Sequence, residues 1–186
     1  GMALQAHQQF DASRQCYLRA SALDPKSFEW RYYLGVVSEG QAAVDAFRSA
    51  LKIRDDLTSR IKLGEALLSI GDDAGAREIL RGIDHPVAWF NYGRATRDAS
   101  YYEKAAAAFP RYGAALFALA QSYQRAGRTA DAQRLMAEYA RSKTIAPPLE
   151  DPLMDAVQAL NRGPDRLLRE AANLERQGQL QPAIAT

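Results

Sequence analysis

The stretch "KLGEALLSIGDDAGAREIL", residues 62–80, contains two short apolar segments separated by a turn. Leu63 and Leu67 recur at helical spacing, and Gly71 stands where a helix commonly ends in a left-handed residue. Gly64 lies inside the first segment, although glycine costs about 1 kcal/mol relative to alanine within a helix. A glycine kept at such a position indicates either a binding site or a place where two helices pack closely.

The same pattern recurs along the chain. A small residue follows leucine or tyrosine at positions 35, 64, 93 and 120, in steps of 29, 29 and 27 residues. After each one comes a break and then a second apolar segment, in which a small residue precedes a bulky one by four positions. These pairs are Ala43/Phe47, Ala76/Leu80, Ala105/Phe109 and Ala132/Met136. The pattern predicts helix–turn–helix units in which the small residues of the two helices face each other at a close crossing.

These positions resemble the tetratricopeptide-repeat family, whose 34-residue unit carries W-x2-L-G-x2-Y, then A-x3-F, then P. Trp89, Tyr92, Gly93, Ala105 and Phe109 match one copy, and four further copies, the first partial, extend the resemblance over roughly residues 4–141. The resemblance implies an all-α, right-handed superhelical solenoid of antiparallel helix pairs. Because the steps are shorter than 34 residues, we expect some repeats to be shortened.

The repeat rhythm predicts three parts. Residues 1–144 form an array of about five units, residues 145–163 a proline-containing linker with a short extra helix, and residues 164–186 a further, truncated unit. Asp151 and Pro152 are expected to cap and to begin the short helix. Because neither end supplies a polar capping repeat, we expect a fragment of a longer array or an array that self-associates through its ends.

Local signals place several helix ends. Ser27 is expected to cap a helix that begins at the next residue, and Gly127 to end one in the left-handed conformation. Ser100 and Glu103 have the spacing of a capping box, and Thr129 is expected to cap the helix that follows it. No segment shows sustained strand alternation, so the expected chain is entirely helical.

Composition narrows the class of protein. Hydrophobic residues make up 47% and charged residues 25% of 186 residues, as in folded soluble proteins. The net charge of +2 is too small to indicate nucleic acid or an anionic membrane. Most of the 24 basic residues are arginine, which favours a bacterial origin. No apolar run is long enough for a membrane span. Gly1 before Met2 indicates an artificial start, so the compartment stays open: cytoplasmic, or periplasmic or secreted if a signal was removed.

A search for chemistry is negative, and the prediction is a protein without enzymatic activity, cofactor or metal. His7 and His85 are far apart in sequence, and no zinc, phosphate-binding or nucleophile motif occurs. We expect His85 to be a surface loop residue and Cys16 a small buried hydrophobe. The pair Asp72–Asp73 is explained better by helix capping than by metal binding.

The family resemblance implies that the first helix of each pair lines a concave groove that binds a partner protein or peptide. Positions near the recurring leucine face this groove in the family. Carried over to this sequence, they are Tyr32, Tyr33, Val36, Lys62, Glu65, Asn91, Arg94, Arg97, Gln121 and Gln124. For any one of them, a solvated helix face without a ligand is the alternative. The family's lysine and asparagine clamp for a terminal carboxylate is absent, which disfavours a chaperone-tail ligand.

The sequence therefore predicts a non-enzymatic interaction scaffold that binds an extended, mildly acidic segment of a partner, with Arg94 and Arg97 receiving acidic side chains. The alternative is a self-associating structural segment, or an accessory repeat domain of a larger multidomain protein. Trp30, Trp89 and Tyr102 could stack on nucleobases, but their helical spacing favours core packing. We expect no nucleic-acid partner.

Overall fold

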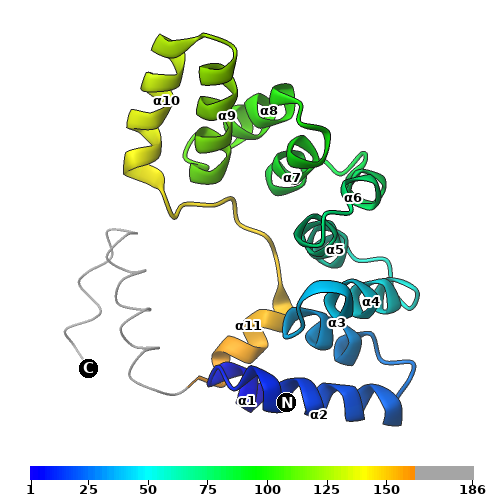
Figure 1. The fold of residues 1–186 in the computed structure, drawn as a ribbon. Helices are drawn as coiled ribbons and strands as arrows, with labels where there is room; N and C mark the ends of the chain where they lie inside the picture. Colours follow the sequence, from blue (N-terminus) through cyan, green and yellow to red (C-terminus); the bar gives the residue numbers. More distant parts are fainter. Residues whose placement is uncertain (162–186) are drawn as a thin grey trace, which may run out of the picture.

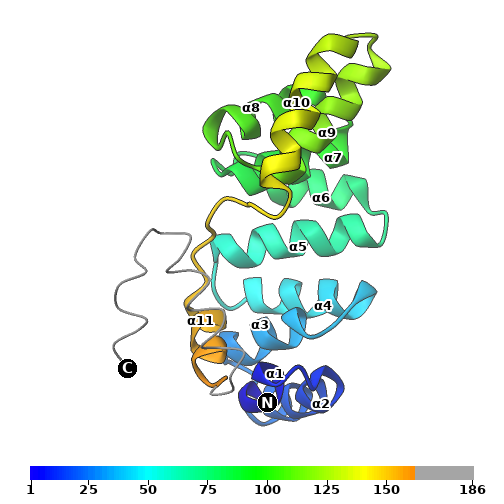
Figure 2. The same ribbon diagram turned by 90° about the vertical axis from the view of Figure 1, so that its left-hand side faces the viewer.

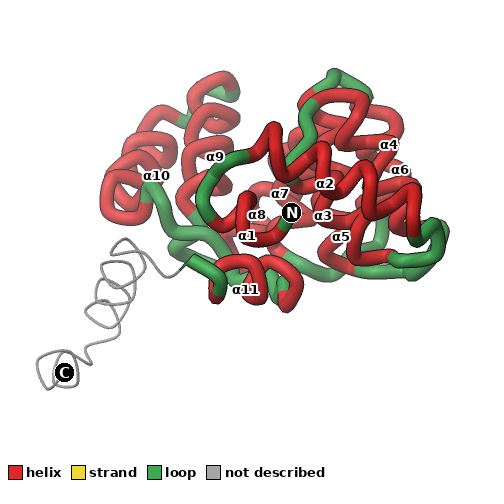
Figure 3. Tube along the Cα trace, turned by 90° about the horizontal axis from the view of Figure 1, so that it is seen from below, coloured by secondary structure: helices red, strands yellow, loops and turns green. Residues whose placement is uncertain are grey.

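A computed structural model describes residues 1–161 of the chain, and every regular element within them is an α-helix (Figures 1 and 3). The helices are α1 Met2–Ala6, α2 Phe10–Leu23, α3 Phe28–Val36, α4 Gly40–Leu51, α5 Leu57–Ser69, α6 Asp73–Leu80, α7 Pro86–Thr96, α8 Ala99–Ala108, α9 Gly113–Arg125, α10 Thr129–Ser142 and α11 Pro152–Ala159. None of them is long and apolar enough to cross a membrane. The truncated unit expected at residues 164–186 lies outside the described residues.

Successive helices from α2 to α10 pack side by side in chain order, which confirms the predicted solenoid of helix pairs. The stack curves into an arc, with its concave side facing the segment that follows α10 (Figure 1). We call α1, α3, α5, α7 and α9 the first helices and the concave surface that they form the inner face. The division of the chain into three parts stays a prediction.

The recurring glycines let a bulky side chain approach the backbone of a first helix. A Cβ atom added at Gly64 would lie 2.6 Å from Cγ of Leu80 on α6, closer than real Cβ contacts. The expected close packing at Gly64 is confirmed, but the nearest residue is the bulky Leu80 and not, as expected, the small Ala76. Ala76 is fully buried in the core beside this contact. The same arrangement recurs in two other units: Gly35 against Phe47, and Gly93 against Tyr102.

Several helix ends follow the sequence signals. The Ser27 hydroxyl accepts a hydrogen bond from the amide of Trp30, and the Asp72 carboxylate accepts one from Gly75 at 2.8 Å. Gly71 and Gly127 adopt φ values of +79° and +76°, in the left-handed region where glycine is preferred. These caps and left-handed glycines confirm the predicted positions.

Two predicted caps are wrong. Helix α7 ends at Arg97 in a left-handed conformation, so Asp98 caps α8 and accepts a hydrogen bond from the Ser100 amide at 2.9 Å. Ser100 is thus already inside α8 and forms no capping box. Thr129 is likewise the first residue of α10, and Arg128 takes the cap position without a side-chain hydrogen bond. A helix that begins one or more residues early satisfies its amides before the expected cap is reached.

Aromatic side chains pack within and against the core, as their spacing predicted. Tyr17 is 1% exposed, and its ring centroid lies 5.2 Å from that of Tyr33. The Trp30 ring is 6.3 Å from that of Tyr17 and packs against the same cluster. Tyr102, on α8, is buried against Gly93 of α7. These contacts account for the aromatic residues without a nucleobase.

After α10 the chain turns back along the array. Residues 143–151, which we call the strap, descend across the inner face, and α11 then packs beside α1 (Figures 1 and 2). The buried Val157 anchors α11 in the core cluster. The carboxylate of Asp151 accepts a hydrogen bond from the Met154 amide at 3.1 Å, so Asp151 and Pro152 begin α11 as predicted.

Candidate binding face

Each first helix, or the residue that caps it, donates a hydrogen bond to the strap or to α11. In every case the array supplies the donor and the strap or α11 supplies the acceptor. From α9 down to α1 the pairs are Gly113 N to Ile145 O (3.0 Å), His85 Nε2 to Pro148 O (3.1 Å), Thr58 Oγ1 to Glu150 O (2.7 Å), Tyr33 Oη to Leu153 O (3.3 Å) and Gln5 Nε2 to Met154 Sδ (3.3 Å). We call Gly113, His85, Thr58, Tyr33 and Gln5 the donor row.

Two members of the donor row depend on local geometry. Gly113 begins α9, and a Cβ atom there would lie 2.3 Å from the carbonyl oxygen of Ser142, so only glycine permits this approach. His85 caps α7 by accepting a hydrogen bond from the Val87 amide on Nδ1 at 3.2 Å. A neutral imidazole that accepts at Nδ1 carries its proton on Nε2, which then donates to the strap. His85 is therefore a partly buried structural residue and not merely a loop surface residue.

Asp151 is the one strap side chain that the array binds through charge. The Tyr32 hydroxyl donates to Oδ2 of Asp151, and Nζ of Lys62 lies 3.5 Å from the same oxygen. The Lys62 and Asp151 side chains are only 25% and 14% exposed. Burial and the neighbouring Asp151 carboxylate raise the pKa of Tyr32, so its hydroxyl stays protonated as a donor. The arrangement fixes one carboxylate at the junction of α3 and α5.

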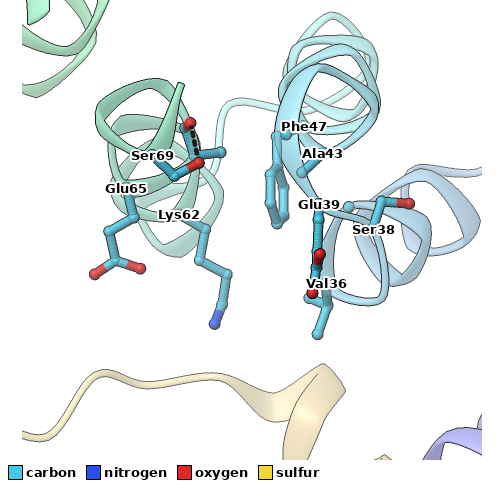
Figure 4. A pocket seen from close by; sticks show the side chains of 11 residues that line it. Val36, Ser38, Glu39, Ala43, Phe47, Lys62, Glu65 and Ser69 are labelled. Atoms are coloured by element: carbon cyan, nitrogen blue, oxygen red, sulfur yellow. Dashed lines mark hydrogen bonds between the residues drawn. The ribbon is translucent and has the colours of Figure 1, made fainter. Parts of the chain in front are cut away.

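A cleft opens beside this junction. It has a volume of about 520 Å³ and lies between α5 and the end of α3. Figure 4 shows Lys62 and Glu65 projecting from α5 towards the segment that contains the strap, with Val36 and Glu39 on the opposite wall. Lys62 and Glu65 carry opposite charges, so the cleft has mixed polarity and suits a polar peptide better than a single ion.

Three arginines lie near the C-terminal ends of α7 and α9, opposite the ends that hold His85 and Gly113. Arg97 and Arg125 line a cavity of about 250 Å³ together with Tyr102. Arg94 lies one turn before Arg97 on α7, with its guanidinium carbon 5.9 Å from the centroid of the Phe90 ring, which itself lies 5.9 Å from the Tyr102 ring. Burial raises the pKa of Tyr102, and the charges of Arg94 and Arg125 lower it by a smaller amount. We call Arg94, Arg97 and Arg125 the arginine cluster. Within the described part of the chain, none of these guanidinium groups forms an ion pair.

The predicted groove residues fall into distinct environments. Tyr32, Tyr33 and Lys62 bind the strap or α11. Asn91 is 1% exposed and bridges Glu65 and Arg94 by hydrogen bonds of 3.1 and 3.2 Å, so it positions other side chains. The remaining four residues divide between the two cavities and solvent: Val36 lines the cleft, Arg97 and Gln121 line the cavity of the arginine cluster, and Gln124 is exposed.

The repeat pattern missed Gly113, Thr58, His85 and Arg125. The first three lie at helix starts, outside the positions that the family signature covers, and their role comes from a segment far away in sequence. Arg125 stands at the end of α9, one turn past the motif. A charged residue near the end of a first helix was the only signal that could have indicated it.

The other chemical groups give no site. No group of three metal-binding side chains comes together within residues 1–161. Cys16 is exposed, so the prediction of a small buried hydrophobe is wrong. It lies on α2 next to Tyr17, which takes the core-facing position instead. A helix of this length can bury only one face, and Cys16 falls outside it.

Comparisons with known proteins show a similarity to one repeat family at the start of the chain and a shared fold over most of it. The tetratricopeptide-repeat family model matches residues 1–56. Two solved structures share the fold. MamA gives a TM-score of 0.66 at 16% identity, over 75% of this chain and 92% of that one. PilW, described as a widely conserved type IV pilus biogenesis factor, gives 0.65 at 18% identity, over 99% of this chain and 94% of that one. No curated protein matches the sequence.

Proposed function

Because residues 1–56 match the tetratricopeptide-repeat family and the described array has the fold of its solenoids, we propose that this protein is a non-enzymatic scaffold that binds an acidic, extended partner segment on its inner face. The family's fold supports protein–protein interaction in general. The finer proposal concerns which part of the inner face binds and what chemistry it selects.

The observation that carries the proposal is the unpaired arginine cluster. Lys62 on the same face already pairs with a carboxylate, that of Asp151. Within residues 1–161, Arg97 and Arg125 have no such partner, and they border a cavity that opens to solvent beside Gln121. Arginine binds carboxylates through two parallel hydrogen bonds, which gives both affinity and geometric selection. A glutamate or aspartate of a partner segment would fill this cavity.

The test uses synthetic peptides that contain one to three acidic residues, with amide-matched peptides in which Asp and Glu become Asn and Gln. We expect selected acidic peptides to bind the full chain and the amide forms to bind at least about tenfold more weakly, as loss of a charge-assisted contact implies. Substituting Arg94, Arg97 and Arg125 together by alanine should abolish this difference. Arg111→Ala, an exposed arginine before α9, is the matched control. Equal binding to the triple variant would refute the arginine cluster as the site.

Self-association is a second candidate, favoured by apolar side chains on the last helix pair. Phe117 and Met136 are 37% and 40% exposed, and the Phe117 ring lies 5.1 Å from that of Tyr139. Exposed apolar side chains grouped in this way favour contact with another protein surface. Light scattering over a range of concentrations separates the two candidates, because end-to-end assembly requires a mass that rises with concentration and a simple peptide binder does not.

A further inference from the structure

The donor row has the spacing of an extended peptide. Its carbonyl acceptors on the strap lie at residues 145, 148 and 150, and its last two acceptors, Leu153 O and Met154 Sδ, lie on α11. A polyproline-type chain advances about 3.1 Å per residue, so two to three residues span about 6–9 Å. Along the strap, a backbone acceptor therefore meets a new first helix, or the residue that caps it, every two to three residues. Many extended sequences can adopt this register.

The composition of the strap suits this register. Its buried residue is Pro147, followed by the exposed Pro148, and proline holds the chain near polyproline geometry. Three of the acceptors are carbonyl oxygens of residues 145, 148 and 150, which every amino acid offers. Charge recognition is confined to Asp151, bound by Tyr32 and Lys62. The array thus binds the strap through backbone carbonyl oxygens, which are independent of sequence, and through the side-chain carboxylate of one residue.

The strap is held by contacts that another chain could reproduce. It contains no helix or strand, and Lys143, Thr144, Ala146 and Glu150 are exposed. Segments with few buried apolar groups and an exposed backbone open at low free energy. Its attachment to the array rests on the hydrogen bonds from Gly113, His85 and Thr58, and on Asp151. Pro147 is also buried, and Leu149 packs against the core. None of these contacts requires that the strap belong to the same chain.

We propose that the three donors that bind the strap, Gly113, His85 and Thr58, form a docking site together with Tyr32 and Lys62. This site takes an extended, proline-containing segment that bears one carboxylate, and the strap is its resident occupant. A partner segment of this chemistry competes with the strap. The inference rests on the proposed function only in taking the inner face as the binding surface, because the arginine cluster lies at the opposite ends of α7 and α9.

The test uses a fluorescent peptide with the sequence of residues 144–160 as the probe and the full chain as the receptor. Asp151→Ala in the receptor removes one of the two anchors of the resident strap but leaves Tyr32 and Lys62 in place. We expect the probe to bind this variant at least about tenfold more tightly than the unaltered chain, since a smaller fraction of sites is occupied. Asp155→Ala, an exposed aspartate of α11 without a side-chain hydrogen bond or ion pair, is the matched control and should leave binding unchanged.

Two further measurements complete the test. A probe in which the residue equivalent to Asp151 is alanine should bind the open receptor at least about tenfold more weakly, as should the unaltered probe on a receptor that also carries Lys62→Ala. Limited proteolysis within residues 143–150 reports whether the strap has opened, and Asp151→Ala with Val157→Asp removes both of its anchors.

An opened strap without probe binding would overturn the inference. A strap that resists proteolysis even in the double variant would also overturn it, because the strap would then be a fixed part of the fold. Loss of the probe site with acidic-peptide binding retained at the arginine cluster refutes this inference alone. The reverse result refutes the proposed function alone.

Discussion

Substituting Gly64 by alanine tests the packing that defines each repeat. The new Cβ atom would lie 2.6–2.7 Å from three atoms of Leu80, whose side chain is 2% exposed and must shift to accommodate it. Overpacking of a core costs about 1–3 kcal/mol, whereas replacing glycine by alanine in a helix gains about 1 kcal/mol. We therefore expect a net loss of about 1 kcal/mol in the free energy of unfolding.

The same substitution should change sign when Leu80 is shortened. In a Leu80→Ala background, which itself costs about 2–5 kcal/mol, the overlap is gone. Gly64→Ala should then stabilise the array by about 1 kcal/mol through helix propensity. The double-mutant cycle thus predicts a coupling of about 2 kcal/mol between the two positions.

The assay is urea unfolding followed by the helical circular dichroism signal. Gly71→Ala serves as the control, because a Cβ atom there meets nothing within 4 Å but the residue has φ of +79°. It should cost about 1 kcal/mol through backbone strain, whether or not Leu80 is present. If Gly64→Ala stabilises both backgrounds equally, the overlap with Leu80 does not explain the glycine, and the reasoning fails.

Two further predictions concern the strap and the N-terminal core. Gly113→Ala places a Cβ atom 2.3 Å from the Ser142 carbonyl oxygen, and should speed proteolysis of residues 143–150; an unchanged rate would contradict the need for glycine there. Burial raises the pKa of Tyr17 to about 12, above the value near 10 of an unfolded chain, so its stabilising effect is present below pH 10 and is lost as the pH rises towards 12. Tyr17→Phe removes a 2.7 Å hydrogen bond to Gln5 and should lower the free energy of unfolding by about 1 kcal/mol at pH 8. In urea unfolding at pH 11, this difference between the variant and the unaltered chain should shrink towards zero. A difference that stays constant with pH would contradict the ionisation of Tyr17.

The repeat architecture was predictable because it depends on local patterns. Periodic leucines, the glycines at 35, 64 and 93, and the left-handed Gly71 and Gly127 each report on their own helix or turn. Where two signals competed within a few residues the prediction was wrong, as at Ser100, because the left-handed Arg97 moved the start of α8. Helix boundaries depend on which of several neighbouring residues satisfies the end first.

The candidate binding face was predictable only in part. Arg94 and Arg97 could be named as groove candidates from the family positions and as polar residues on an apolar helix, and their role stays a prediction. The contacts of Asp151 with Tyr32 and Lys62 were not predictable, since the path of the strap brings Asp151 to residues far away in sequence, 119 positions away for Tyr32. Nothing in a repeat pattern states where a proline-rich linker will run. Tertiary contacts of a non-repeating segment therefore need the structure.

The return of α11 to α1 also changes how the array deforms. In an ordinary solenoid each repeat contacts only its neighbours, so nothing connects the two ends of the array directly. Here a hydrogen bond joins Gln5 on α1 to Met154 on α11, 149 residues later, so the strap connects α10 to the opposite end of the arc. The five-residue α1 is too short to be stable alone and depends on this distant support. Opening of the strap would remove this link between the two ends of the described array, and we expect the first helix to unravel with it.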